Sequence, residues 1–263
     1  MKCFFLKIVL LLWSSNAFSQ YHQSLKKSID KVIRYDTDFS FEKTPGFLIG
    51  IKIDRSIHTF NYGHFLSQDS TLSVDSLYFH LGGLSKTITA NLIHLLIEHD
   101  VLSLEDTLAD FFPHGRFNSS IESLTIESLL THQSGLPKQP TNLFECQKSE
   151  SDRYAHYNRE CLIDFLNSVR RLHRNFIYSD VNYAILYEIL IHLMQEDTLA
   201  QLLTERWKTL GFSGRPLHPE VLTTKNPGID KYGQIVPPQN SQSFEGSLGY
   251  IASLRELLNY MEN

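Results

Sequence analysis

The stretch that decides the fold reads Leu129-Leu130-Thr131-His132-Gln133-Ser134-Gly135-Leu136-Pro137. A second stretch lies upstream, His80-Leu81-Gly82-Gly83-Leu84-Ser85-Lys86-Thr87, and a third lies downstream, Tyr178-Ser179-Asp180-Val181-Asn182-Tyr183. In the upstream stretch, Gly83 and Lys86 are three residues apart at the start of a predicted helix, so they share one helix face. A serine at the first of these positions would be activated as a nucleophile by the lysine amine. Glycine has no side-chain atom that can attack, so the pattern keeps the lysine and lacks the nucleophile.

These stretches carry a resemblance to a known family. From about Pro45 to Tyr260 the chain resembles the serine β-lactamase-related family, which includes class C β-lactamases, DD-peptidases and related esterases. The central run is nearly the family's most recognisable motif, and the downstream stretch resembles its Tyr-x-Asn element. Three weaker matches stand in the family's order: Pro45–Ile51, Leu102–Asp106 with Phe111-Phe112-Pro113, and Leu210–Phe212. Five matches in the right order identify the family, although one alone would be weak.

The resemblance implies an α+β fold in which a helical lobe packs on an antiparallel sheet. In the family, later strands return to complete that sheet, and one carries a Lys-Thr-Gly or His-x-Gly triplet. This sequence reaches Asn263 before such a strand, so we expect an incomplete sheet and a partial domain over residues 20–263. The nearest imitation of the triplet is Lys231-Tyr232-Gly233, which lies too early and close to Pro237-Pro238, unlike a central strand. We interpret it as coincidence.

Hydrophobic periodicity places the other expected elements. From Leu84 onward apolar side chains recur at helical spacing around much of the circumference, which is typical of a helix buried between neighbours. Two expected strands, 46–53 and 56–62, meet at Asp54-Arg55, a turn without the glycine that tight hairpins favour. Residues 138–157 are polar and predict a surface loop over a cleft. Further helices are expected over 24–34, 125–131, 158–170, 181–195, 197–209 and 251–261.

The composition is that of an ordinary globular protein. At 263 residues the chain is long enough for one sizeable domain, and its hydrophobic content of 42% suffices for a core. A net charge of −5 and a pI near 6.2 give no support to nucleic-acid binding. The histidines and cysteines show no metal-ligand spacing, so we expect neither a metal nor another cofactor. The oligomeric state stays open.

Residues 1–19 are typical of an export signal. Lys2 and Lys7 are basic, residues 8–13 are apolar, and residues 17–19 form a small-x-small cleavage site. The apolar run is too short to span a bilayer stably. We therefore expect a periplasmic or secreted protein without a stable membrane anchor.

Removal of that signal would leave two cysteines, Cys146 and Cys161. In an oxidising compartment they could form a disulfide across the segment between them. Two unpaired thiols are the alternative, and the sequence does not decide between them.

The resemblance also assigns roles to candidate site residues. Lys86 and Tyr178 match the lysine and tyrosine that handle the proton when a family member forms a serine ester. We predict that both catalytic positions are vestigial, because Gly83 stands where the nucleophile would be. Asp180 stands where the family usually has asparagine, and a carboxylate accepts hydrogen bonds but does not donate them. It is the candidate substrate-binding residue, and a candidate partner for Lys86, which would be costly to bury unpaired.

Two neighbouring residues have competing interpretations. Ser85 is the fallback nucleophile, but adjacent residues on a helix diverge by roughly 100° and do not face each other. A role in the first helical turn is therefore favoured for Ser85. His132 is expected to hold its loop in place rather than to act as a base.

Three functions remain open from the sequence. The first is an exported, catalytically inactive family member that binds a peptide or peptidoglycan-like ligand between two lobes. The second is an active serine hydrolase, of the esterase, peptidase or β-lactamase type, that forms an acyl-enzyme through a displaced nucleophile such as Ser85. The third is a non-functional truncated gene product, whose two-stranded hairpin would expose an edge.

Overall fold

A computed structural model describes the chain over residues 20–33, 46–54, 56–63, 77–113, 115–146, 153–173, 175–213, 228–229, 235–236 and 241–262. The chain divides into two compact units, Met1–Asp75 with Ile229–Val236, and Ser76–Gly228 with Pro237–Asn263. The expected export signal over residues 1–19 and the triplet Lys231-Tyr232-Gly233 lie outside the described residues.

The first unit contains the expected hairpin. Strand β1 (Gly46–Ile53) pairs antiparallel with β2 (Ser56–Gly63), and the register places Ile53 opposite Ser56 next to the turn. Asp54 adopts a φ of +51°, a left-handed conformation that aspartate tolerates better than most residues. The aspartate thus supplies a turn conformation for which a glycine was expected.

A helix over residues 20–33 contacts strand β2 within this unit. The His22 ring stacks on Phe60 with their centroids 4.6 Å apart. Farther along the helix, the Tyr62 hydroxyl donates a hydrogen bond of 2.7 Å to Asp30, which also pairs with Lys26 one turn earlier. The aromatic contact and the polar contact together fasten the helix to β2. A separate short ladder joins β4 (Gly228–Ile229) and β5 (Ile235–Val236).

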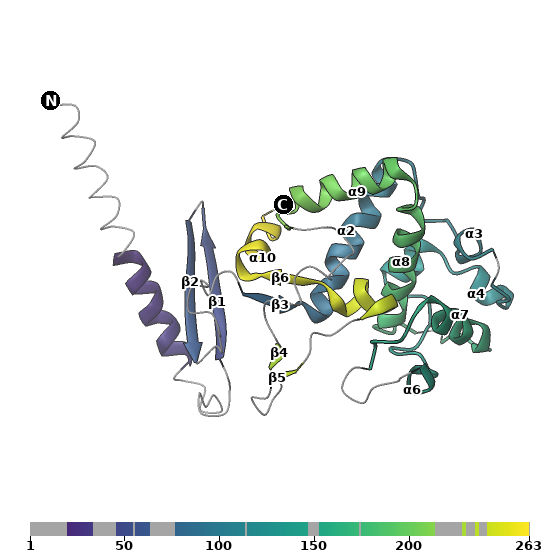
Figure 1. Cartoon of the computed structure of the whole chain (residues 1–263), viewed down its shortest axis with the longest axis horizontal. Coiled ribbons are helices and arrows are strands. Elements are labelled where there is room, and N and C mark those ends of the chain that lie inside the picture. The colour runs from purple at the N-terminus through teal and green to yellow at the C-terminus, as the bar shows by residue number, and fades with distance from the viewer. Residues whose placement is uncertain are drawn as a thin grey trace. The chain divides into compact units, whose positions relative to one another are not determined.

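The second unit is built around two helices, α2 (Ser85–Glu98) and α8 (Asp180–Leu193), which lie against each other (Figure 1). Every residue of α8 from Asp180 to Leu190 is buried, so this helix runs through the core. Each large apolar side chain buried in this way contributes about 1.5–3 kcal/mol. Around these two helices stand α3 (Leu108–Phe111), α4 (Ser119–Glu122), α5 (Ile126–Leu130), α6 (Leu143–Cys146), α7 (Arg159–Ser168), α9 (Asp197–Thr209) and α10 (Leu254–Tyr260).

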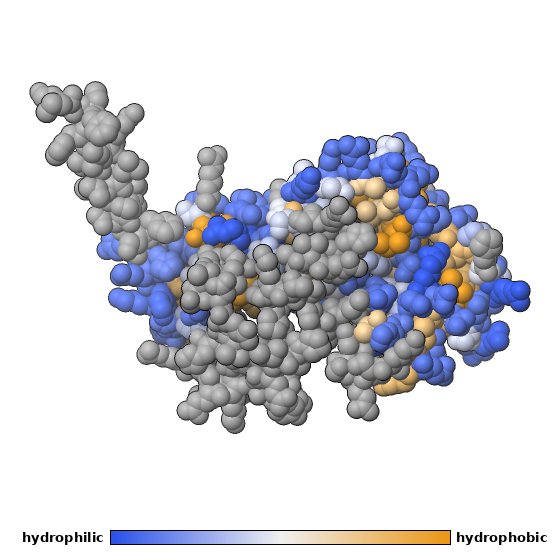
Figure 2. Space-filling view, in the orientation of Figure 1, coloured by the Kyte–Doolittle hydropathy of each residue, from blue (hydrophilic) through white to orange (hydrophobic). Residues whose placement is uncertain are grey.

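The outer face of the second unit is mostly hydrophilic, with small hydrophobic patches between charged side chains (Figure 2). Amphipathic helices over an apolar core produce this distribution. No helix among the described residues is long and apolar enough to cross a membrane. The mixture of helices with small antiparallel sheets confirms the α+β class.

Two expectations about local structure are wrong in part. The segment expected to be a helix from residue 251 begins with β6 (Ile251–Ser253), which pairs antiparallel with β3 (Tyr78–His80). Ser253 then caps α10 together with Glu256, which delays the start of the helix to Leu254. The segment 138–157, expected to be an irregular loop, contains the short helix α6, and its residues 147–152 lie outside the described residues.

A disulfide joins Cys146, at the end of α6, to Cys161, in the first turn of α7. Asn142 donates a hydrogen bond of 2.9 Å to the Cys161 carbonyl oxygen, and Asn158 caps α7 by accepting from the Cys161 N–H at 3.1 Å. The pairing that the sequence left open is therefore a bridge, and it lies within a local hydrogen-bond network.

Removal of this bridge with a Cys146→Ser/Cys161→Ser variant should lower the free energy of unfolding by about 3 kcal/mol, because the unfolded chain regains the entropy of a closed loop of this length. Urea denaturation of the oxidised protein and of the variant measures the difference. As a control, a reducing agent should destabilise the native chain and leave the variant unchanged. Equal stability of the two oxidised proteins would contradict the bridge.

Candidate functional site

The site begins where a turn of 3-10 helix, η2 (Gly82–Leu84), runs directly into α2. Gly82 adopts a φ of +52°, a conformation that favours glycine. A β-carbon built on Gly83 would lie 3.1 Å from the Tyr178 hydroxyl oxygen. The structure therefore brings the predicted nucleophile position and the predicted proton-handling tyrosine together, at the start of the helix that carries Lys86.

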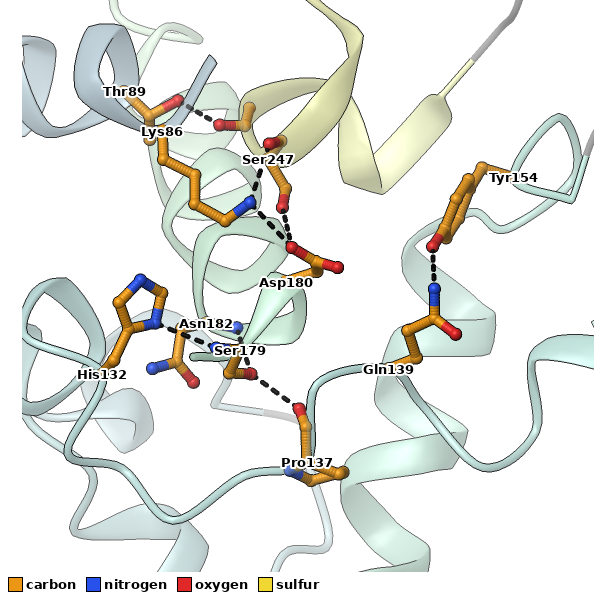
Figure 3. Close-up of polar contacts among 11 residues, drawn as sticks. Lys86, Thr89, His132, Pro137, Gln139, Tyr154, Ser179, Asp180, Asn182 and Ser247 are labelled. Atoms are coloured by element: carbon orange, nitrogen blue, oxygen red, sulfur yellow. Dashed lines mark hydrogen bonds and ion pairs between the residues drawn. The ribbon is translucent and has the colours of Figure 1, made fainter. Parts of the chain in front are cut away.

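Lys86 is held by two oxygen atoms in the interior (Figure 3). Its Nζ lies 2.7 Å from Oδ1 of Asp180, and it donates a hydrogen bond of 3.0 Å to the Ser247 carbonyl oxygen. The side chains of Lys86 and Asp180 are only 5% and 4% exposed. The Ser247 hydroxyl donates to the same Asp180 oxygen at 3.5 Å. The partner expected for Lys86 is thus Asp180, and Ser247 completes the arrangement.

This pairing limits what Lys86 can do chemically. A lysine that accepts a proton from a nucleophile needs a free lone pair, whereas a protonated lysine has three N–H donors and no acceptor. Here the ammonium group faces the carboxylate and the carbonyl oxygen, and the face of the Tyr178 ring lies 4.9 Å from Nζ. The geometry is that of a satisfied buried cation.

His132 lies behind Tyr178 and holds the backbone. Its Nδ1 accepts a hydrogen bond of 3.1 Å from the Ser179 N–H, and its ring packs against Tyr178 with the centroids 4.6 Å apart. Burial lowers the pKa of His132, and the nearby Lys86 charge lowers it further, while Asp180 opposes the shift. A neutral ring whose Nδ1 already accepts a backbone proton has the loop-holding role expected for this histidine.

The turn around His132 positions the first residues of α8. Gly135 has a φ of +75°, and a β-carbon there would lie 2.2 Å from the His173 carbonyl oxygen, so only glycine fits. The Ser134 hydroxyl donates to Asn182 Oδ1 at 2.7 Å, and the Asp180 N–H donates to the Lys138 carbonyl oxygen at 2.9 Å. These bonds explain why the central sequence motif is specific: it fixes the backbone that presents Asp180.

The fallback nucleophile Ser85 is fully buried in the first turn of α2. Its hydroxyl oxygen accepts a hydrogen bond of 3.2 Å from the Tyr250 N–H. Three residues later, on the same helix, Thr89 donates to the Gly246 carbonyl oxygen at 2.7 Å. Both side chains thus join α2 to the segment that also supplies the Ser247 carbonyl.

That segment contains a π-helical turn, η5 (Glu245–Gly249), which contacts both α2 and α8. Glu245 is 2% exposed, and its Oε1 is buried without a hydrogen-bond partner among the described residues. Burial raises the pKa of the Glu245 carboxyl to about 7, against the opposing effect of a hydrogen bond with the Ser241 backbone. The turn that holds Lys86 therefore also carries a strained acid.

Sequence reasoning missed three contributors to this site. Ser247 and Glu245 lie in a segment that was matched to the family but given no side-chain role, because π-helical turns leave no clear periodic signal. Gln139 directly follows the central motif and donates a hydrogen bond of 2.7 Å to the Tyr154 hydroxyl (Figure 3). Burial raises the pKa of Tyr154, and the Asp180 charge raises it further, which places this tyrosine near the ion pair. No group of three or more His, Cys, Asp or Glu in the described part of the chain could hold a metal ion.

Comparison with known proteins agrees with this geometry. The family model described as Beta-lactamase matches residues 36–261. The chain belongs to the beta-lactamase family. A curated relative, a beta-lactamase of Psychrobacter immobilis, is 34% identical over 91 residues, which cover 35% of this chain and 22% of that enzyme. This family member therefore spans only part of the length of the curated enzyme that it matches.

Solved structures show the same fold for this beta-lactamase-family chain. A class C beta-lactamase from Rhodobacter sphaeroides superposes with a TM-score of 0.64 at 21% identity, over 92% of this chain and 64% of the other. A D-alanine carboxypeptidase from Burkholderia cenocepacia gives a TM-score of 0.64 at 22% identity, over 90% of this chain and 64% of the other. At such identities the likeness establishes a class C beta-lactamase-like fold, and confirms the expected one.

A Lys86→Met variant should be destabilised by about 3–5 kcal/mol, because it leaves the Asp180 carboxylate buried without its cation. Urea denaturation at pH 7 measures the loss. The double variant Lys86→Met/Asp180→Asn removes both charges and should regain most of the stability. A loss below about 1 kcal/mol in the single variant, typical of a surface pair, would contradict a buried ion pair.

Glu245 should make the stability of this family member fall as the pH rises. Its folded-state pKa of about 7 exceeds the model value of 4.5, so the stabilisation by the protonated form is complete below pH 4.5 and is lost as the pH rises through 7. The loss amounts to about 3 kcal/mol. Urea denaturation at pH 5 and pH 8 should show a smaller fall in a Glu245→Gln variant than in the native chain. A matched change at exposed Glu160, Glu160→Gln, should leave the fall intact; equal falls in all three proteins would refute the assignment.

Proposed function

We propose that this chain is an exported, catalytically inactive member of the beta-lactamase family that retains a ligand-binding site for a peptide or peptidoglycan-like molecule. The observation that carries the proposal is the buried ion pair between Lys86 and Asp180, next to a glycine at the nucleophile position. An acyl-enzyme needs a side-chain nucleophile and a base with a free lone pair. Gly83 provides no nucleophile, and Lys86 is occupied as a cation.

The geometry of Ser85 gives no support to a displaced nucleophile. Its side chain is fully buried, and its hydroxyl oxygen already accepts the Tyr250 N–H. An attacking hydroxyl must reach both a substrate carbonyl and a base. The hydroxyl of Ser85 is instead committed to the contact between α2 and the start of β6.

Two features support binding and export. Tyr178 remains 46% exposed beside Gly83, so that an aromatic surface is accessible at the former reaction centre. One of the proteins that share this fold is a D-alanine carboxypeptidase, whose name indicates action on a peptide end. The disulfide between Cys146 and Cys161 suits an oxidising compartment, as does the signal-like sequence of residues 1–19.

The purified chain should form no covalent adduct with a reactive β-lactam or with a fluorophosphonate probe. Intact mass spectrometry of protein that unfolds cooperatively measures this, and a class C beta-lactamase serves as the positive control. The same spectrum shows whether residues 1–19 are removed on export. A stoichiometric adduct on the folded chain would overturn the proposal of inactivity.

A Gly83→Ser variant tests the reason for inactivity. The new β-carbon lies 3.1 Å from the Tyr178 hydroxyl, which must shift slightly, but Lys86 stays paired with Asp180. The variant should therefore remain unlabelled by the same probes. The matched double variant Gly83→Ser/Asp180→Asn weakens the hold on Lys86 and should be labelled faster. Full labelling of the single variant would show that the ion pair does not prevent catalysis.

A further inference from the structure

The two oxygens of the Asp180 carboxylate have different surroundings. Oδ1 takes both the ammonium group of Lys86 and the hydroxyl of Ser247. Oδ2 receives no hydrogen bond from any described residue, and it is not among the fully buried oxygens that lack a partner. Figure 3 shows it directed away from Lys86. A carboxylate has about four lone-pair positions, so Oδ2 can accept a hydrogen bond while Oδ1 holds the lysine.

The second polar group nearby is the amide of Gln139. Its Nε2 donates to the Tyr154 hydroxyl at 2.7 Å, which leaves its carbonyl oxygen without a hydrogen bond from the described part of the chain. Figure 3 shows that oxygen pointing away from Tyr154. The proximity of this pair to Asp180 follows from the effect of the Asp180 charge on the pKa of Tyr154. A second acceptor thus stands near the carboxylate.

The donors around the site are already used. Lys86 is directed at Asp180 and at the Ser247 carbonyl oxygen. His132 is a hydrogen-bond acceptor at Nδ1. The ion pair cancels the one buried positive charge, so an incoming carboxylate or carbonyl oxygen finds acceptors where it needs donors. A group that donates several hydrogen bonds, and carries positive charge, complements the same atoms.

We propose that Asp180 and Gln139, with Tyr154 holding the glutamine, form a subsite that takes the primary ammonium group of a ligand. The inference rests on the proposed binding function and names its ligand chemistry: a molecule with a free amino group, such as an unblocked peptide end. Asparagine at position 180 would suit a substrate amide, which both donates and accepts. Aspartate shifts the preference towards the donor.

The test compares two probes that differ only in this group, D-alanyl-D-alanine and N-acetyl-D-alanyl-D-alanine. NMR titration of the oxidised native chain at pH 7 should show binding of the free amine about tenfold tighter than binding of the acetylated form, as expected for one hydrogen bond to a charged group. Equal or tighter binding of the acetylated dipeptide would overturn the subsite and leave the proposed binding function standing. Failure of both dipeptides to bind would count against both proposals.

Variants locate the preference. Asp180→Asn should abolish the tenfold difference or reverse it, since the amide can accept from Lys86 and also donate to the acetyl carbonyl. Gln139→Leu removes the second acceptor from a half-buried position and should weaken the preference without disturbing the ion pair. Asp164→Asn makes the same charge change at an exposed position of α7 and should leave it unchanged. A preference that survives both Asp180→Asn and Gln139→Leu would place the amine elsewhere and overturn the assignment.

Discussion

The contact on which the second unit depends is the buried ion pair between Lys86 and Asp180. It joins the first turn of α2 to the first turn of α8, and the Ser247 carbonyl oxygen ties both to η5. Burying either charge alone would cost several kcal/mol, roughly the whole stability margin of an ordinary domain. The two helices can therefore pack closely at this point only if both charged residues are present and well placed.

Well-placed charges need a rigid backbone, and the turn of residues 132–138 provides it. His132 holds the Ser179 N–H, the Lys138 carbonyl oxygen holds the Asp180 N–H, and Ser134 reaches Asn182. Ser179 adds a helix cap, because its hydroxyl accepts from the Asn182 N–H and donates to the Pro137 carbonyl oxygen. A motif associated with catalysis in the family thus performs a structural task here: it fixes the start of α8 whether or not a nucleophile is present.

The helices with strong periodicity could be predicted from the sequence to within a few residues. Apolar side chains from Leu84 onward lie in α2, and the segment expected over 181–195 is α8 (Asp180–Leu193). Elements formed by distant pairing could not be predicted in this way. Strand β3 exists because β6, more than 150 residues away, lies beside it, and no local pattern marks three-residue strands. The disulfide was likewise left open, since spacing alone does not bring two sulfur atoms together.

By itself, the sequence determined the family, the class of fold, and the identities of Gly83, Lys86, Tyr178 and Asp180 as the residues in question. It did so because a glycine at a nucleophile position, and an aspartate in place of asparagine, are differences of chemistry that are visible in the letters alone. Only the tertiary structure decided that Lys86 faces Asp180, that Ser247 and Glu245 share a π-helical turn beside them, and that Gln139 is held by Tyr154. The physical reason is that ion pairing and burial depend on distances between residues far apart along the chain, and only the packing of α2, α8 and η5 sets those distances.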